Sequence, residues 1–294
     1  MRSITLLSPA KINLTLEVLG QRPDGYHEIR SLMQPVDLFD EVRVETIDTP
    51  GIEFTSSGIE IPSGAYNLAS RAAEIYLKKA GLKSGVKIHI KKKIPTGAGL
   101  GGGSGNAAAV LTGMNRIFNA LTEEDLFLLS PGLGADVAFF IRSATALVHG
   151  IGERITVLRD FPLFCYVVLC PNLEIATADI YRKWDELNKD TVMETGDGRD
   201  IAEDIERFKS GDGDFPLMND LELPASALHP EIKAYKEILF SLGAKNVLMT
   251  GSGSAVFAVF GDEDEALQIY DYLKTTPTFR VYFTRGIKGW HRII

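Results

Sequence analysis

The sequence predicts an α+β protein of two domains. Alternating apolar and polar residues, as in strands, open the chain, and helical patterns with capping residues follow in irregular order with further strands. A length of 294 residues exceeds what a single hydrophobic core usually holds. We therefore expect an N-terminal domain over residues 1–158 and a C-terminal domain over residues 159–294.

The composition indicates a soluble globular protein and excludes several other classes. Hydrophobic residues make up 45% of the chain and charged residues 24%, which is the usual globular proportion. The net charge of -8 argues against a general nucleic-acid binder. No signal peptide is visible, and the longest apolar run, Phe161–Pro171, is too short to cross a bilayer. We expect a cytoplasmic protein that binds neither nucleic acid nor membrane.

The first half is expected to open with strands and then a helix. Apolar and polar residues alternate over Ser3–Leu19 and Glu41–Ile47, which is typical of strands. A helix should follow over Asn67–Ala80, because Asn67 is a good N-cap and Gly81 a good C-terminal stop. The next strand begins at Val86 and again alternates.

More helices are expected after this strand. Residues Ala107–Phe118 carry apolar side chains at helical spacing, so the free N–H groups of the first turn should face the segment before it. A further helix begins at Thr122. The segment Ala135–Ile141 and a strand over Ala144–Gly150 complete the half.

The second half is expected to mix strands and helices around a separate core. The segment Asn188–Asp214 is polar and rich in Gly and Asp, and we assign it no function. The elements expected on either side of it are the strand Phe164–Leu169, the helix Pro230–Leu242 and the strands Asn246–Met249 and Ala255–Phe260, with a Gly/Ser turn over 250–254.

The cysteines and histidines indicate neither a disulfide nor a metal centre. Cys165 and Cys170 are the only cysteines, and a separation of five residues in a strand puts them on opposite faces. The five histidines are scattered without the spacing of metal ligands. We expect two reduced, buried thiols.

A glycine-rich run is the strongest functional signal in the sequence. Five glycines fall within residues 97–103, and a small-residue helix follows. Uncovered backbone N–H groups can approach an anion closely, and the helix directs the positive end of its dipole to the same place. The phosphate-binding loop predicted from this run comprises Pro95, Thr96, Gly97, Ala98, Gly99, Leu100, Gly101, Gly102, Gly103, Ser104 and Gly105.

Two better-known glycine signatures do not fit this run. A P-loop requires a lysine, and none lies between Ile94 and Asn115. Gly97, Gly99 and Gly102 match the dinucleotide pattern, but the strand before them alternates instead of being continuously apolar. A nucleotide bound through another kind of loop is the better interpretation, and a dehydrogenase is disfavoured.

Three polar residues could complete a phosphoryl-transfer site. Lys11 and Asn13 share one face of the first strand, which by itself is explained more simply as a solvated edge. Asp136 lies in a small-residue turn, where its ordinary role would be an N-cap. Together with the glycine run, however, they suggest a carboxylate that accepts a hydroxyl proton and an ammonium that keeps it ionised.

The basic run Lys91–Lys93 has a simpler interpretation. Acidic residues dominate elsewhere, so a solvated strand end is favoured over a phosphate-binding role. The alternative from another class of protein is a non-catalytic nucleic-acid module that uses this run as its contact surface. Steep salt dependence of RNA binding would identify such a module.

Three motifs resemble those of the galactokinase, homoserine kinase, mevalonate kinase and phosphomevalonate kinase (GHMP) superfamily. They are Pro-Ala-Lys-Ile-Asn-Leu near the start, the Pro-Thr-Gly-Ala-Gly-Leu-Gly-Gly-Gly-Ser loop, and Thr-Gly-Ser-Gly late in the chain. The resemblance spans the chain. It implies an N-terminal domain like domain 2 of ribosomal protein S5, a ferredoxin-like C-terminal domain, and a site for ATP and substrate between them.

Further motifs resemble the branch of this superfamily that phosphorylates the 2-hydroxyl of a cytidyl substrate in non-mevalonate isoprenoid biosynthesis. They are Arg22–Glu28, Leu133–Val137 and Asn219–Glu222. The resemblance implies ATP and Mg²⁺ as cofactors, the metal ligands being unassigned, and a small-molecule cytidyl substrate as partner. A monomer or a homodimer is expected.

The resemblance also implies roles for the residues of the reaction centre. Asp136 would be the general base and Lys11 its catalytic partner, while Asn13 would hydrogen-bond near the substrate hydroxyl. The glycine-rich loop would wrap the ATP phosphates. Asn67 would lie near the adenine, although from its position alone it is only a helix cap.

The same resemblance implies a site for the cytosine. Tyr26 and His27 would recognise the base, one by stacking and one through hydrogen bonds. Tyr181 would close the other side, and Thr177 is expected among the substrate-binding residues. Without the resemblance, Tyr26 and His27 are explained more simply as a strand beside a turn at Asp24–Gly25.

Three positions depart from the motifs of this branch. A rival activity within the same superfamily also has to be considered. Gly105 replaces a second serine and leaves Ser104 as the single loop hydroxyl able to touch a phosphate or a magnesium ion. Ala138 replaces a proline, and Tyr181 replaces a phenylalanine. The nearer rival is another kinase of the superfamily, of the mevalonate or homoserine type. In such an enzyme Tyr26 and His27 would have no cytosine to bind.

Overall fold

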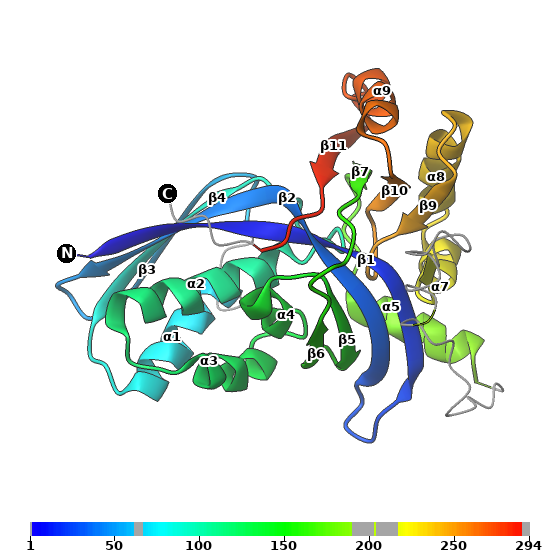
Figure 1. Ribbon diagram of the computed structural model, residues 1–294. Coiled ribbons are helices and arrows are strands. Elements are labelled where there is room, and N and C mark those ends of the chain that lie inside the picture. The colour runs from blue at the N-terminus through cyan, green and yellow to red at the C-terminus, as the bar shows by residue number, and fades with distance from the viewer. Residues whose placement is uncertain (1, 62–66, 190–202, 204–216, 290–294) are drawn as a thin grey trace.

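Two β-sheets form the framework of the molecule (Figure 1). The structure is a computed structural model that describes residues 2–61, 67–189, 203 and 217–289. Neighbouring strands of the larger, seven-stranded sheet are, in order, β3 (Gly51–Gly58), β4 (Gly85–Lys92), β2 (His27–Ile47), β1 (Ser3–Gln21) and β8 (Met218–Asn219). Its remaining strands are β5 (Ala146–Gly150), which pairs with β2, and β6 (Arg154–Val157), which pairs with β5.

Helices from the first half of the chain cover one face of this sheet (Figure 1). They are α1 (Leu68–Ala80), α2 (Gly102–Phe118), α3 (Glu123–Leu129) and α4 (Val137–Arg142), with a 3-10 turn η1 (Ser130–Gly132). The expected ends of α1 are confirmed, because the Asn67 side chain accepts a hydrogen bond from the Ala69 N–H and Gly81 adopts φ +66°. Thr122 caps α3 in a reciprocal box with Asp125.

The smaller sheet belongs to the second half of the chain. Its antiparallel strands are, in order, β11 (Phe279–Arg285), β7 (Cys165–Pro171), β10 (Val256–Phe260) and β9 (Asn246–Met249). The helices of this half are α5 (Thr177–Leu187), α7 (Glu222–Leu228), α8 (Glu231–Ser241) and α9 (Glu263–Leu273). Their apolar faces share a core with Leu16 and Val18 of β1, so the long first strand contributes to both halves.

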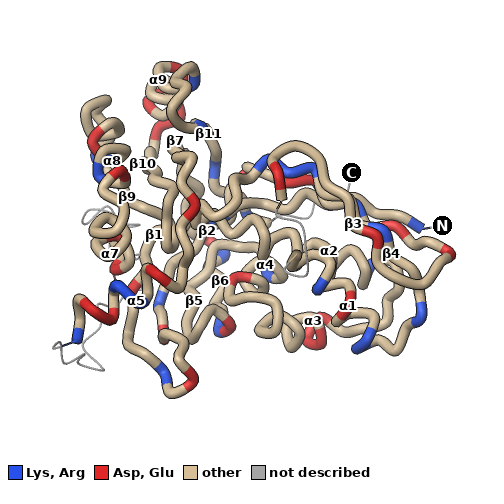
Figure 2. Tube along the Cα trace, turned by 180° about the vertical axis from the view of Figure 1, so that it is seen from behind, with Lys and Arg blue, Asp and Glu red and all other residues tan. Residues whose placement is uncertain are grey.

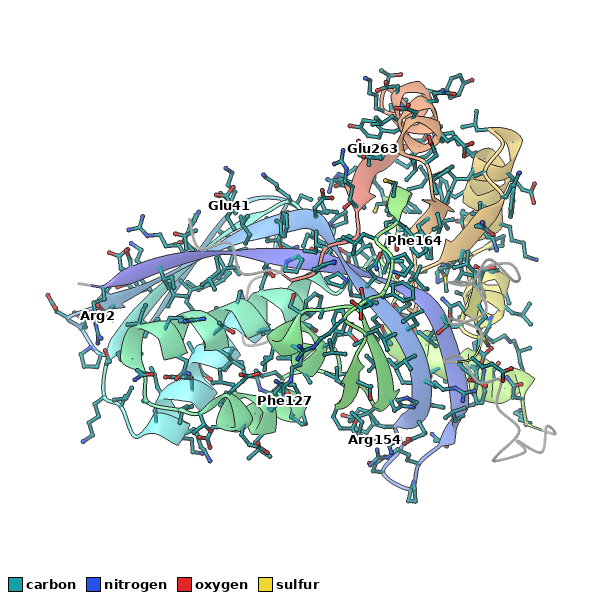
Figure 3. The ribbon with its side chains drawn as sticks, in the orientation of Figure 1. Arg2, Glu41, Phe127, Arg154, Phe164 and Glu263 are labelled. Carbon is teal, nitrogen blue, oxygen red and sulfur yellow. The ribbon has the colours of Figure 1, made fainter. Side chains whose placement is uncertain are left out.

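A separate apolar core joins the two halves. Ile12 and Leu14 of β1 pack there with Tyr166 and Phe257 of the smaller sheet. Phe164, which Figure 3 labels at the junction of the two halves, belongs to the same core. The two halves therefore meet in a close-packed interface.

Two elements begin earlier in the chain than the sequence predicts. β2 begins at His27 instead of Glu41, because β1 pairs with it along nearly its whole length in one long hairpin. α2 begins at Gly102 instead of Ala107. Glycine has low helix propensity, so the sequence pattern placed the start too late, whereas packing against Ser8 and Ile94 stabilises the glycine turn as helix.

Several elements were not predicted at all. They are β3, β6, β8, β11, α5, α7 and α9. β8 comes from the second half of the chain but pairs with β1 in the larger sheet. Residues 190–202 and 204–214 of the polar segment lie outside the described residues. The domain limits 1–158 and 159–294 stay a prediction.

The expectation of two reduced, buried thiols is only half met, because Cys170 is buried whereas Cys165 is half-buried. Cys165 and Cys170 are free and contact different cores, and burial raises the pKa of Cys170 to about 12. Basic and acidic segments alternate along the described chain (Figure 2). Among the described helices, none is long and apolar enough to cross a membrane.

Candidate active site

A cavity of about 1170 Å³ lies where the two halves meet. Its walls come from β1, β2, the segment before α2, the start of α4, α5 and the turn between β9 and β10. Of the residues singled out from the sequence, those that line it are Lys11, Asn13, Tyr26, His27, Asn67, Pro95 through Ser104, Asp136, Thr177 and Tyr181. Gly105 does not line the cavity and instead packs against Ser8 and Pro9 inside the fold.

Lys11 and Asp136 face each other across this cavity. The Lys11 Nζ lies 3.6 Å from Asp136 Oδ2. The lysine side chain is buried, whereas 24% of the aspartate side chain is exposed. Asp136 occupies the N-cap position of α4, but its side chain makes no capping hydrogen bond. The capping role expected from its position alone is therefore wrong, and the carboxylate remains directed to Lys11.

Asn13 connects Lys11 to the second half of the chain. Its Oδ1 accepts a hydrogen bond of 2.5 Å from Lys11 Nζ, and its Nδ2 donates to Ser31 Oγ at 2.8 Å. The Asn13 backbone N–H donates to Thr250 Oγ1 at 3.0 Å. Lys11 and Asn13 are thus buried, and the solvated edge that their pattern suggested is wrong because the 250–254 turn covers this face.

Tight packing explains two glycines of the loop before α2. Gly99 has φ +74°, and a Cβ there would lie 2.1 Å from the Thr250 carbonyl oxygen. Gly101 has φ +70°, and its Cβ would lie within 3.0 Å of the Phe140 ring and the Lys11 stem. Only glycine combines this conformation with this closeness, so the loop is drawn against the Lys11 side of the cavity.

The N-terminus of α2 opens toward the cavity without a side-chain cap. Gly101 is the N-cap residue and supplies no side chain to accept from the first N–H groups. Gly102, Gly103 and Ser104, which carry those groups, all line the cavity. Uncapped N–H groups and the dipole of this 17-residue helix make the position favourable for a phosphate.

Lys92 corrects the interpretation of the basic run. Lys91 and Lys93 are exposed, but Lys92 is buried, and its Nζ lies 2.6 Å from the fully buried carboxylate of Asp40. Burial lowers the pKa of Lys92, and the charge of Asp40 opposes that shift. Lys92 also lines the cavity, and its ammonium would meet a Cβ placed on Gly102 at 2.8 Å. The middle lysine therefore supports the loop from within the protein.

Three side chains on one face of α5 contact His27 at the start of β2. Tyr181 stacks on the imidazole with ring centroids 4.6 Å apart and planes at 24°, and Trp184 meets it edge-on at 5.7 Å. Asp185 Oδ1 lies 2.7 Å from His27 Nε2. Two rings 4.6 Å apart leave no room for a third ring between them, and the neighbouring Tyr26 side chain is 61% exposed.

The Tyr181 hydroxyl stays a hydrogen-bond donor in this setting. Burial raises the pKa of Tyr181 well above its ordinary value, and the negative charge of Asp136 adds to the shift. The negative charge of Asp136 thus reaches the aromatic side chain that stacks on His27.

The turn between β9 and β10 is a part of the site that the sequence analysis left unassigned. Gly251, Ser252 and Gly253 line the cavity, and Ser252 Oγ lies 2.8 Å from Thr177 Oγ1. Asn219 holds the turn, because its Nδ2 donates to the carbonyl oxygens of Met249 and Gly251 at 2.7 and 2.8 Å. The motif Thr-Gly-Ser-Gly was the available signal, but only the fold brings it to Lys11.

Three cavity-lining residues keep buried polar atoms without partners. Asn67 Nδ2, Thr96 Oγ1 and Asn106 Oδ1 make no hydrogen bond within the described part of the chain. Asn67 Oδ1 is already used to cap α1, so its amide is the group left over. Orphaned polar atoms at a cavity are typical of places where a ligand completes the hydrogen bonding.

Comparisons with known proteins agree with this architecture. The family described as GHMP kinases N terminal domain matches residues 67–144, and that described as GHMP kinases C terminal matches residues 192–277. A 4-diphosphocytidyl-2-C-methyl-D-erythritol kinase from Geobacter sp. (strain M21) is 43% identical, the match covering 90% of this chain and 92% of the relative. One from Caldicellulosiruptor saccharolyticus is 40% identical over 90% and 91%.

Solved structures give the same result. The crystal structure of a 4-(cytidine 5'-diphospho)-2C-methyl-D-erythritol kinase superposes with a TM-score of 0.81 at 38% identity, covering 96% of this chain and 99% of the other. A homoserine kinase from Cytophaga hutchinsonii, with a TM-score of 0.73 at 20% identity over 100% and 98% of the chains, shares the fold. The fold and these matches define a small-molecule kinase. The chain belongs to the GHMP kinase family.

Gly103 offers a test of the loop that leaves the fold intact. It lacks a positive φ, and a Cβ there would meet only Leu68, at 3.7 Å. Gly103→Ala should therefore retain or raise the melting temperature, since alanine favours helix by about 1 kcal/mol over glycine. The added methyl group would displace a phosphate at the start of α2, so we expect KM for ATP to rise roughly tenfold or more.

Steady-state kinetics and thermal melts of Gly103→Ala check this result. Gly261→Ala is the matched control, because a Cβ there meets nothing within 4 Å and the residue lies outside the cavity lining. An unchanged KM for ATP in Gly103→Ala would mean that the phosphates bind elsewhere.

Proposed function

We propose that this chain uses ATP to phosphorylate the 2-hydroxyl of 4-diphosphocytidyl-2-C-methyl-D-erythritol, giving the 2-phosphate and ADP in non-mevalonate isoprenoid biosynthesis. The observation that carries the proposal is the meeting of three features in one cavity: the glycine-rich loop, the Lys11–Asp136 pair and the Tyr26–His27 hairpin. Relatives that bear the name of this kinase, at 38–43% identity, support the choice of substrate.

ATP would bind along the glycine-rich loop. The uncapped N–H groups at the start of α2 are suited to the phosphates, and Lys92 behind them adds positive charge. The adenine would lie near Asn67, whose unpartnered Nδ2 offers a donor. Residues 95–104 would wrap the phosphate chain, whereas Gly105 would support the loop from inside the fold.

The reaction would be carried by the charged pair. Asp136 accepts the proton of the 2-hydroxyl as the oxygen attacks the γ-phosphorus of ATP, and the bond from that phosphorus to the bridging oxygen of ADP breaks. Lys11 offsets negative charge on the phosphoryl group in transit, while its hydrogen bond to Asn13 holds the ammonium in place. Catalysis would rest mainly on positioning and charge stabilisation.

A magnesium ion fits this site as a companion of the nucleotide. Among the described residues, no group of three or more His, Cys, Asp or Glu side chains could hold a metal. Mg²⁺ at nucleotide sites is commonly bound through one or two carboxylates, waters and the phosphates themselves. Ser104 is the loop residue that would supply an oxygen, and the ion would neutralise phosphate charge.

A substrate panel tests the proposal. ATP consumption is measured with 4-diphosphocytidyl-2-C-methyl-D-erythritol, mevalonate and homoserine at equal concentrations. We expect useful turnover with the cytidyl substrate alone, and weaker binding of that substrate after His27→Ala. Faster turnover with mevalonate or homoserine would overturn the assignment in favour of the corresponding kinase.

The remaining expectations stay predictions. They are the cytoplasmic location, the state of monomer or homodimer, and the absence of nucleic-acid binding. For the last, we expect no steeply salt-dependent affinity for RNA, because the chain has a net charge of -8 and its described basic segments are interleaved with acidic ones (Figure 2).

A further inference from the structure

We propose that Asp185 is the positioning residue that makes His27 selective for a base with an exocyclic amino group. The inference rests on the proposed function, because it assumes that His27 meets the base of the substrate. Asp185 itself need not touch the substrate. It acts by holding one nitrogen of the imidazole, so that the other nitrogen has a defined hydrogen-bonding character.

The geometry of the pair determines which nitrogen carries the proton. Asp185 Oδ1 lies 2.7 Å from His27 Nε2, which is a hydrogen-bond distance. An ionised carboxylate only accepts hydrogen bonds, so Nε2 must be the donor. A neutral His27 is then the Nε2–H tautomer, and its Nδ1 carries a lone pair.

The Nδ1 atom is the one left for a ligand. It makes no hydrogen bond to any residue that the structure describes, although His27 is buried and lines the cavity. A bare Nδ1 accepts from the amino group of cytosine but repels the carbonyl oxygen that uracil carries at the same position. The pair therefore gives the site a chemical reason to prefer cytosine.

The rest of α5 prevents the imidazole from turning. Tyr181 stacks on its face, Trp184 meets its edge, and Asp185 binds its Nε2. These residues are spaced i, i+3 and i+4, so they share one face of the helix. His27 begins β2 in the first half of the chain, whereas α5 belongs to the second half, so base selection depends on how the halves meet.

Binding measurements with CDP and UDP test the selectivity without requiring turnover. We expect the parent protein to prefer CDP, and Asp185→Ala to lose roughly tenfold in CDP affinity with less than about a twofold change for UDP. Asp179→Ala is the matched control, because it removes an exposed carboxylate from the same helix and lies outside the cavity lining. Equal losses for CDP and UDP in Asp185→Ala would overturn the proposal.

A double-mutant cycle shows whether Asp185 acts through His27. In the His27→Ala background, Asp185→Ala should cause little further change in the ratio of CDP to UDP affinity, because the positioned group is gone. Additive losses would mean that Asp185 contributes independently, contrary to the proposal. Comparison of melting temperatures shows whether any variant has lost its fold.

The tautomer can be measured directly, apart from any substrate. A protonated and a bare imidazole nitrogen differ in ¹⁵N chemical shift, and loss of signals in His27→Ala identifies His27 among the five histidines. We expect the Nε2–H form in the parent at a pH where the ring is neutral, and a mixture in Asp185→Ala. The Nδ1–H form in the parent would refute the proposal. Failure to bind either nucleotide would instead refute the proposed substrate class, while the nitrogen shifts still decide the tautomer.

Discussion

Asp136→Asn should abolish turnover while leaving ATP binding nearly unchanged. The amide keeps the size of the side chain but cannot accept the hydroxyl proton, and loss of a general base lowers rates by roughly 10²–10⁴-fold. Turnover assays measure the loss of catalysis, and ATP titrations measure the binding of ATP separately. Because Asp136 lines the cavity without capping α4, the helix itself should not depend on its charge.

A second aspartate provides the control for Asp136. Asp262 does cap its helix, since its side chain accepts from the N–H groups of Asp264 and Glu265. Asp262→Ala should lose about 1 kcal/mol of stability and keep full turnover, the opposite of the result for Asp136→Asn. Turnover of Asp136→Asn within about tenfold of the parent would show that another group takes the proton.

Asp40→Ala should destabilise the fold more than any surface substitution. The carboxylate is fully buried and accepts from Lys92 Nζ at 2.6 Å, from the N–H groups of Lys93 and Ile94 at 2.7 and 2.9 Å, and from Asn106 Nδ2 at 3.0 Å. Its loss leaves a buried ammonium without a counter-charge, which costs about 3–5 kcal/mol. The free energy of unfolding in urea measures the effect.

The neighbouring acidic residue is the matched control. Glu41 pairs with the exposed Lys91 and Lys93 at 3.2 and 3.8 Å, so Glu41→Ala should cost less than about 1 kcal/mol. If Asp40→Ala fails to fold, Asp40→Asn combined with Lys92→Met removes both charges and keeps an acceptor for the two N–H groups. The double variant should be more stable than Asp40→Asn alone. Equal stability of Asp40→Ala and Glu41→Ala would disprove the role of the buried pair.

Local sequence signals succeeded where a residue acts on its immediate neighbours. Asn67 and Gly81 end α1 as expected, because capping involves only the adjacent turns of backbone. The glycine run was recognisable because the freedom of glycine is a property of the residue itself. Its helical part was missed, since packing overrode the low propensity of Gly102 and Gly103.

Local signals failed where burial depends on distant segments. Lys92 has the same side chain as Lys91 and Lys93, yet of the three ammonium groups only that of Lys92 pairs with Asp40 from β2. Lys11 and Asn13 resembled a solvated face because the turn that covers them lies more than two hundred residues away in the chain. The sequence did not predict that Asp185 pairs with His27, because the residues around each of them carry no pattern that points to the other.

By itself, therefore, the sequence determined the local geometry of the glycine loop and the caps of α1, and it predicted a phosphate-binding site with charged residues able to serve a kinase. Resemblance of separate motifs added the family and its substrate. The tertiary structure decided which charges meet, since it places Lys11 Nζ 3.6 Å from Asp136 Oδ2 and Asp185 Oδ1 within hydrogen-bond distance of His27 Nε2. The physical reason is that glycine geometry and helix caps are set by neighbouring backbone, whereas ion pairs and burial arise only when remote strands and helices pack.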